Sequence, residues 1–304
     1  MHDTLYKRIT VTPAIPDSTV ALLAVIVANA ALAFGPWFVR VSDTGPVASA
    51  FWRITLAAPM LVAAASARGW RPVAGVAPVL SRRLWWMIAL GGISFSADLA
   101  SWHLGILRTT LANATLLGNS ATLMFPIYGF LIARAWPTRL QGCALALAAI
   151  GAGLLMGRSY QLDPRHLAGD LLCVLAGLLY TVYFILMSRV RAVLAPLPAL
   201  ALSTVASIVP LLCFALLLGE KLLPTHWAPL IGLALVSQIV GQGLMIYGLG
   251  RLPPLTIGLA LLVQPMVGTT IGWVVYHEQL GWADWVGALL VAIALVLVTR
   301  PARA

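Results

Sequence analysis

Ten apolar runs, each about long enough to cross a membrane, constrain this 304-residue chain more than any other feature of its sequence. A transmembrane helix needs about 20 mostly apolar residues. Only 9% of the residues are charged, whereas a soluble domain carries roughly 25%. The runs therefore predict an all-α polytopic membrane protein, with spans near 18–39, 46–67, 84–107, 109–132, 140–157, 168–188, 193–218, 227–249, 254–276 and 280–299.

The charges between these spans are distributed unequally. When both termini are placed on one side, thirteen cations and two acids fall on that face, and five cations and six acids fall on the other. Because cytoplasmic loops carry the excess of Lys and Arg, this asymmetry predicts that both termini are cytoplasmic. Membrane orientation thus accounts for the formal net charge of +10, and no nucleic-acid partner is expected.

A weak internal repeat relates the two halves of the chain. Residues 116–120 align with residues 261–265 at an offset of 145. The match pairs spans three to five with spans eight to ten, so the second set of five helices enters the membrane from the opposite side. Inverted repeats are typical of transporters, in which the substrate lies between the halves.

The sequence predicts a central cavity and four segments: a cytoplasmic tail (1–17), a first five-helix repeat (18–157), a second, inverted repeat (168–299) and a cytoplasmic C-terminal tail (300–304).

Uncharged amide side chains lie near the middle of several predicted spans. They are Asn29, Asn119, Gln238, Gln242 and Gln264. An amide without a partner costs several kcal/mol in hydrocarbon, so these groups are expected to face the bundle interior. Two interpretations stay open, namely hydrogen bonds between helices and the polar wall of a substrate cavity. Trp102, Tyr180 and Tyr183 are candidates for an aromatic wall, although core packing is the commoner role of such residues.

Two charged residues, Arg53 and Asp98, fall inside predicted spans. At 1.5 Å per residue, both lie about 10 Å below the membrane surface. Since an isolated charge at the centre of a transmembrane helix costs about 2.5–3.5 kcal/mol, the two residues are predicted to form an ion pair. A fixed structural clamp and a proton site are both open as roles for this pair.

Two prolines fall inside predicted spans that also carry candidate amides. Pro265 directly follows Gln264 in the ninth span, and Pro126 follows Asn119 in the fourth. A proline leaves the carbonyl one turn before it without its helical donor, so each is expected to kink its helix. Kinks at this depth suit a helix that moves during transport, and they also occur as plain architecture.

The chain lacks sequence motifs for catalysis. It contains no phosphate-binding loop and no dinucleotide fingerprint. His277 and Glu278 begin like a zinc-protease motif, but Gly281 stands where the second histidine is required. Asp98 has no acidic partner inside a span, as an intramembrane protease would need. No enzyme activity, metal or cofactor is therefore expected.

The run 277–287, together with ten spans and an inverted repeat, resembles the EamA branch of the drug/metabolite transporter superfamily. Members typically end the fourth helix of each repeat with Glu and start the next helix with Gly, a pattern that Glu278 and Gly287 match. The first repeat keeps Gly142 but lacks the Glu. Arg53 also resembles an Arg that is common in the second helix of this family.

Within that family, the amides and aromatic residues are most similar to the lining of YddG-type exporters of aromatic and neutral amino acids. This resemblance implies a ten-helix basket, a multi-pass location in the bacterial inner membrane, and alternating access around a cavity. Its substrates would be amino acids or similar small metabolites. Facilitated uniport and proton-coupled efflux of drugs or metabolites stay open as mechanisms. A non-transporting membrane scaffold or lipid-binding subunit is the alternative, and the oligomeric state is left open, with a monomer sufficient.

Overall fold

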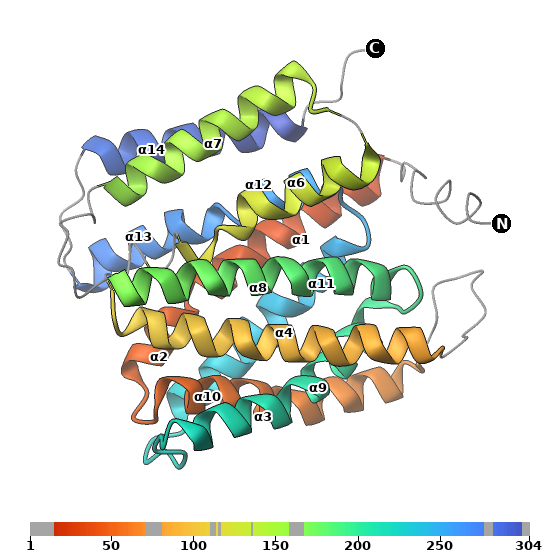
Figure 1. Cartoon of the computed structure of the whole chain (residues 1–304), viewed down its shortest axis with the longest axis vertical. Coiled ribbons are helices and arrows are strands. Elements are labelled where there is room, and N and C mark those ends of the chain that lie inside the picture. The colour runs from red at the N-terminus through yellow and green to blue at the C-terminus, as the bar shows by residue number, and fades with distance from the viewer. Residues whose placement is uncertain are drawn as a thin grey trace.

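The computed structural model describes residues 15–70, 81–109, 114, 117–134, 136–157, 167–276 and 282–299. They form helices joined by short loops (Figure 1). The first half contains α1 (Ile15–Ala33), α2 (Gly35–Val41), α3 (Pro46–Ala67), α4 (Arg82–Ile106), α6 (Ala121–Ala133) and α7 (Arg139–Gly157). The second half contains α8 (Leu167–Arg191), α9 (Pro196–Leu217), α10 (Ala228–Gly232), the π-helix η3 (Leu233–Gln242), α11 (Gly243–Leu249), α12 (Pro254–Ala260), α13 (Val263–Tyr276) and α14 (Trp282–Thr299).

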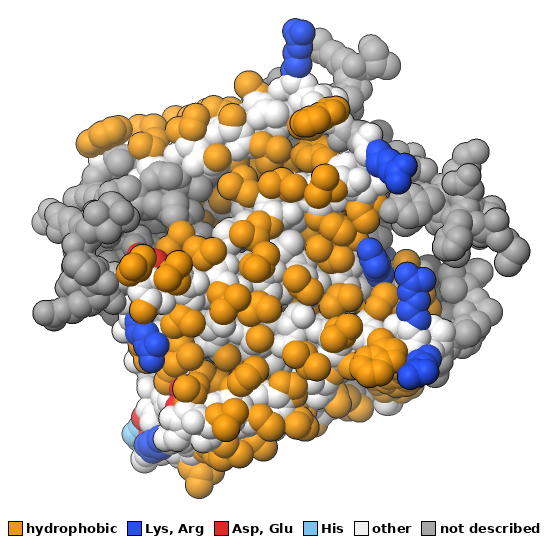
Figure 2. Space-filling view, viewed as in Figure 1, with side chains coloured by type: hydrophobic (Ala, Val, Ile, Leu, Met, Phe, Trp, Pro, Cys, Tyr) orange, Lys and Arg blue, Asp and Glu red, His pale blue; other side chains and the backbone are white. Residues whose placement is uncertain are grey.

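The helices have the length and surface of a membrane bundle. Seven segments are long and apolar enough to cross a membrane: Ser18–Val41, Pro46–Ala67, Arg82–Ile106, Leu167–Arg191, Pro196–Leu217, Ala228–Leu249 and Pro254–Val275. Two shorter apolar helices cover Ala121–Ala133 and Arg139–Gly151. Apolar side chains spread over the face shown in Figure 2, and the Lys and Arg side chains lie toward its edges. The prediction of an all-helical polytopic membrane protein is therefore confirmed.

Three of the predicted spans are interrupted rather than continuous. The first span breaks at Phe34, because Pro36 has no N–H to donate to the carbonyl of Leu32 four residues before it. The ninth breaks at Leu261 and Leu262, just before Pro265 in the first turn of α13. The fourth has a turn at residues 119–120, whereas the predicted kink residue Pro126 lies inside α6 without ending it.

Helices from the two halves of the chain pack against each other. Helix α4 packs on α8 and α9, α3 on α9, α6 on α12, and α7 on α14, while α1 contacts η3, α11, α12 and α13. Helices α7 and α14 form a separate layer at one edge of the bundle (Figure 1). Helix α1 begins and α14 ends at the same end of the bundle (Figure 1). The core therefore lies between the halves of the chain.

A set of loop contacts, which we name the loop clamp, joins the α2–α3 loop to the α9–α10 loop at the other end of the bundle. The backbone N–H of Gly45 donates to Lys221 O at 3.0 Å, and the N–H of Ala48 donates to Glu220 Oε2 at 2.7 Å. Asp43 Oδ2 accepts the backbone N–H of Thr225 at 2.6 Å and lies 3.2 Å from Lys221 Nζ. The clamp thus ties the first half of the chain to the second at this end.

The loop clamp has a predictable pH dependence. Hydrogen bonds from Thr225, first from its backbone N–H, and the contact with Lys221 lower the pKa of Asp43 well below its usual range. A carboxylate with a lowered pKa stabilises the fold above its unfolded pKa of about 3.9 and loses that contribution as the pH falls further. The melting temperatures of wild type and Asp43→Asn should differ by a small, constant amount from pH 8 to pH 5, and converge below pH of about 4. A difference that disappears near pH 6 would contradict this assignment.

Candidate functional site

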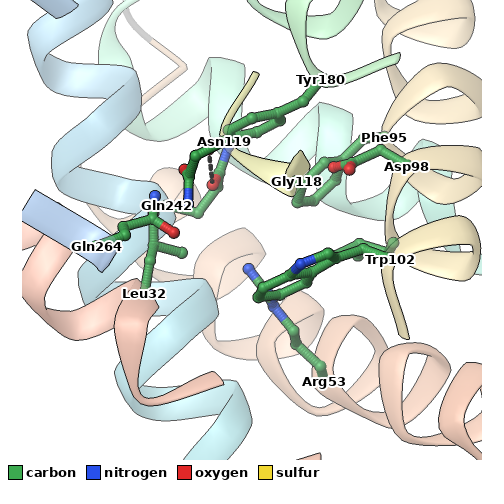
Figure 3. Close-up of a pocket in the computed structure, with 11 residues that line it drawn as sticks. Leu32, Arg53, Phe95, Asp98, Trp102, Gly118, Asn119, Tyr180, Gln242 and Gln264 are labelled. Carbon is green, nitrogen blue, oxygen red and sulfur yellow. Dashed lines mark hydrogen bonds between the residues drawn. The ribbon is translucent and has the colours of Figure 1, made fainter. Parts of the chain in front are cut away.

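A cavity of about 40 Å³ lies between the two halves of the chain. Figure 3 shows side chains entering it from helices far apart in the sequence. Five of the predicted binding residues line it, together with both predicted intramembrane charges. The lining consists of Leu32, Arg53, Phe95, Asp98, Leu99, Trp102, Gly118, Asn119, Tyr180, Gln242 and Gln264.

Helix α4 supplies four consecutive positions of one helical face to the cavity. Phe95, Asp98, Leu99 and Trp102 are spaced i, i+3, i+4 and i+7, so their side chains lie on the same side of the helix. The Trp102 indole N–H donates to Ala114 O at 3.1 Å, which fixes the ring against the cavity. One wall of the site is therefore an apolar and aromatic stripe that carries a single carboxylate.

The interrupted spans place polar groups at the cavity. Asn119 and Gln264 lie next to the breaks in the fourth and ninth spans, and both are buried. Gln264 Nε2 donates to Asn29 Oδ1 at 2.8 Å, and Asn29 Nδ2 donates to Val25 O at 2.8 Å. Asn29 thus lies behind Gln264 and outside the lining, where it joins α1 to α13.

The π-helix η3 separates two glutamines that were expected to share one polar stripe. Gln242 lines the cavity, and its Oε1 accepts the Tyr180 hydroxyl at 3.1 Å. The Nε2 of Gln242 is buried without a hydrogen-bond partner among the described residues. Gln238 lies outside the lining, where its Oε1 accepts Arg53 Nε at 3.1 Å and its Nε2 donates to Thr204 Oγ1 at 3.1 Å. π-Helical turns are rare and often occur at functional sites.

A cluster of aromatic rings from α4 and α8 forms and supports part of the cavity wall. Phe95 stacks on Tyr183 with ring centroids 4.6 Å apart, and the ring centroids of Tyr180 and Phe184 are 4.1 Å apart. The Tyr183 hydroxyl reaches Ser203 Oγ at 3.4 Å, and this ring lies outside the cavity lining. Of the two tyrosines predicted for the site, Tyr180 therefore lines the cavity and Tyr183 supports Phe95 from behind.

The two intramembrane charges share the cavity without touching each other. Arg53 is 2% exposed and Asp98 is 8% exposed. Within the described residues, no hydrogen bond or ion pair of up to 4.0 Å joins them, and Arg53 instead donates a hydrogen bond from Nε to Gln238 Oε1. Figure 3 shows Arg53 entering from α3 and Asp98 from α4. The predicted direct ion pair is therefore replaced by two separate charges on one cavity.

The sequence of the chain matches a known family of membrane proteins. The profile of the EamA-like transporter family matches residues 167–300, which form most of the second half. The permease-like protein YdzE of Bacillus subtilis is 35% identical over 68 residues, a stretch that covers 87% of that protein and 22% of this chain. The chain belongs to the EamA-like transporter family. A transporter from Archaeoglobus fulgidus, of uncharacterized function, is 22% identical over 269 residues, or 86% of this chain and 90% of the relative.

The fold of this EamA-like transporter also has a counterpart among solved structures. One crystal structure superposes with a TM-score of 0.73 at 16% sequence identity, over 94% of this chain and 98% of the other. At that identity the likeness concerns the fold alone. Glu278, the acidic residue of the family motif, lies outside the described residues, whereas Gly287 is buried in α14.

Sequence reasoning missed four cavity residues of this EamA-like transporter as members of the site: Leu32, Phe95, Leu99 and Gly118. Helical spacing identifies two of them, because Phe95 lies three residues before Asp98 and Leu99 lies three residues before Trp102, on the same face of α4. Gly118 has a steric role, since a Cβ added there would lie 2.7 Å from Trp102 Nε1. No sequence signal distinguishes Leu32 from the other apolar residues of α1.

Proposed function

We propose that this EamA-like transporter exports aromatic or neutral amino acids, or similar small metabolites, by alternating access. The observation that carries the proposal is the cavity between the two halves, lined by aromatic rings, amides and one charge of each sign. Small-molecule sites are mostly apolar and aromatic, with a few convergent polar groups that fix the orientation of the ligand. Phe95, Tyr180 and Trp102 would contact an apolar side chain, and Gln242 and Gln264 the polar part of the substrate.

The size of the cavity supports a mechanism with moving halves. Its volume of about 40 Å³ is far below the roughly 300–1,000 Å³ of ligand pockets. A substrate of that size would therefore fit only after the lining residues move apart, as alternating access requires. The loop clamp closes one end of the bundle, which the charge distribution predicts to face away from the cytoplasm.

The helix contacts support the proposed inverted repeat of five plus five helices, with residues 18–157 and 168–299 as its units. In such a repeat α3 corresponds to α9, and α7 to α14, and each of these pairs is in contact. The contact of α4 with α8 likewise has its counterpart in the contact of α1 with η3 and α11. A pseudo-twofold arrangement produces this pattern, because it maps each contact between helices onto another or onto itself.

Two driving forces are compatible with this site. We favour facilitated transport down a concentration gradient. Proton-coupled efflux is the second candidate, because Asp98 is a carboxylate on the cavity wall without a hydrogen-bond partner among the described residues. Carboxylates inside membranes are often parts of proton relays. Counterflow measured with and without a pH gradient separates the two mechanisms, since only coupled transport responds to the gradient itself.

Counterflow of labelled phenylalanine into liposomes preloaded with unlabelled phenylalanine tests the function. We expect uptake above that of empty liposomes in the wild type. In Gln242→Ala the rate at low substrate concentration should fall roughly 2–12-fold, the equivalent of one buried hydrogen bond. Gln141→Ala is the control, because Gln141 caps the start of α7 through Thr138, away from the cavity. The assay is repeated with other labelled neutral amino acids. If none of them enters above the background, the protein is not an amino-acid carrier, and the result favours the alternative of a non-transporting membrane scaffold.

A further inference from the structure

The cavity holds two opposite charges that are both available to a ligand. Arg53 uses only its Nε in the bond to Gln238, and the hydrogen bonds of the described residues leave its two terminal nitrogens unused. Asp98 accepts no hydrogen bond from any described residue. Both side chains are buried and both line the cavity. Buried charges in proteins are normally paired and fully hydrogen-bonded, so two incompletely satisfied charges on one cavity point to a ligand.

The surroundings of each charge fix its position. Gln238 is held by Thr204 and in turn holds Arg53, so the guanidinium is oriented before any ligand binds. The Arg53 guanidinium carbon also lies 5.9 Å from the centre of the Phe95 ring. Asp98 projects from the middle of α4, one turn after Phe95 and one turn before Trp102. Preorganised charges of this kind bind a complementary ligand at a lower entropic cost.

We propose that the cavity binds both charged groups of one α-amino acid, its carboxylate at Arg53 and its ammonium at Asp98, and thereby selects zwitterions. This inference rests on the proposed function and names the feature that its substrates share. A guanidinium presents a fork of N–H donors that matches a carboxylate, and a carboxylate accepts hydrogen bonds from an ammonium. The unpaired Nε2 of Gln242 supplies a further donor to the carboxylate of the substrate.

The absence of a direct ion pair between the two residues is what permits this binding. A pair in contact would satisfy both charges and leave the cavity nothing with which to recognise a zwitterion. When they are apart, Arg53 and Asp98 still attract each other through space, which limits the cost of the empty site. The substrate completes the set of charges, and its side chain then lies against Phe95, Tyr180 and Trp102.

Competition against labelled phenylalanine in the counterflow assay tests the inference. The competitors are phenylalanine, phenethylamine, which lacks the carboxylate, and 3-phenylpropionate, which lacks the ammonium. In the wild type each single-charge analogue should inhibit at least tenfold more weakly than phenylalanine, as expected for the loss of a charge-assisted hydrogen bond. Equal inhibition by all three compounds, together with active counterflow, would overturn the inference while leaving the proposed function intact.

Two variants test the inference further, because each should remove the preference for phenylalanine over one single-charge analogue. Asp98→Asn should lose at least tenfold in phenylalanine affinity but keep its affinity for 3-phenylpropionate, and Arg53→Gln should behave in the same way toward phenethylamine. Asp170→Asn and Arg251→Gln are matched controls outside the cavity and should keep the wild-type order. Melting curves establish that each variant folds, and the wild-type competition series decides the matter if a variant does not. If both variants lower the affinity for all three ligands equally, Arg53 and Asp98 do not bind the carboxylate and the ammonium of the substrate separately, and the inference is wrong.

Discussion

Replacement of Gly92 by valine should lower the melting temperature of the protein by about 5–10 °C and reduce the yield of folded transporter. Gly92 lies where α4 crosses α9. A Cβ atom added there would lie 2.5 Å from the Cβ of Ala206 and 2.8 Å from its backbone carbonyl carbon. Because a backbone atom cannot rotate away, the helices must separate, at a cost of about 3 kcal/mol or more.

The same crossing is held by buried hydroxyl groups. Ser96 Oγ lies 2.7 Å from Gly92 O and 3.0 Å from Ser207 O, and Ser207 Oγ lies 3.2 Å from Gly92 O. Separation of the helices would leave these polar groups without partners in an apolar interior, which adds to the cost. Since α4 carries the stripe from Phe95 to Trp102, the substitution should also disturb the cavity.

Gly142 provides the control for this experiment. It lies in α7, and a Cβ atom added there would meet nothing within 4 Å. Gly142→Val should therefore leave the melting temperature nearly unchanged, because valine is not worse than glycine in a helix. Equal melting temperatures for Gly92→Val and Gly142→Val, measured in the same detergent, would show that the α4–α9 crossing is not tightly packed.

Replacement of Gln238 by leucine should lower phenylalanine counterflow at least tenfold, although Gln238 does not line the cavity. Its Oε1 accepts the Nε of the buried Arg53 guanidinium. A buried hydrogen bond to a charged group contributes about 1.5–3 kcal/mol, which corresponds to roughly 10–150-fold. Without this bond, Arg53 loses the contact that fixes its orientation toward the cavity.

Two further variants distinguish this positioning role from a general loss of stability. Gln238→Glu supplies an acceptor for Arg53 and should fold, but it neutralises the guanidinium and should still weaken phenylalanine binding. Gln141→Leu removes a glutamine outside the cavity and should keep the wild-type rate. If Gln238→Leu transports phenylalanine at the wild-type rate, Arg53 does not depend on Gln238 for its position.

The fold was predictable where one strong signal bounds each element. Helix α3 covers Pro46–Ala67, the range expected from an apolar run that begins with a proline and is followed by Arg68. The break in the ninth span could also be placed near Pro265. No proline lies next to the turn at Asn119 and Ser120, and no sequence signal marks the π-helical form of η3. Neither could be predicted, because both depend on packing against neighbouring helices.

The sequence predicted how deep in the membrane the site residues lie, but not which way their side chains point. Counting residues from the span ends places Gln238, Gln242 and Arg53 near the cavity, and all three are buried there or next to it. The sequence does not show which way each side chain points around its helix axis. That direction decides whether Gln242 faces the substrate while Gln238 holds Arg53, and whether Arg53 and Asp98 meet.

The loop clamp has a consequence for the tolerance of this protein to changes in chain length. Its contacts are divided among one backbone pair, Gly45 with Lys221, and the carboxylates of Glu220 and Asp43, so no single side-chain substitution removes all of them. Exposed loops usually tolerate inserted residues well. Here one added residue between α2 and α3 would shift the N–H groups of Gly45 and Ala48 out of register with their acceptors. This short, partly buried loop is therefore a poor place for an epitope tag or a fused domain.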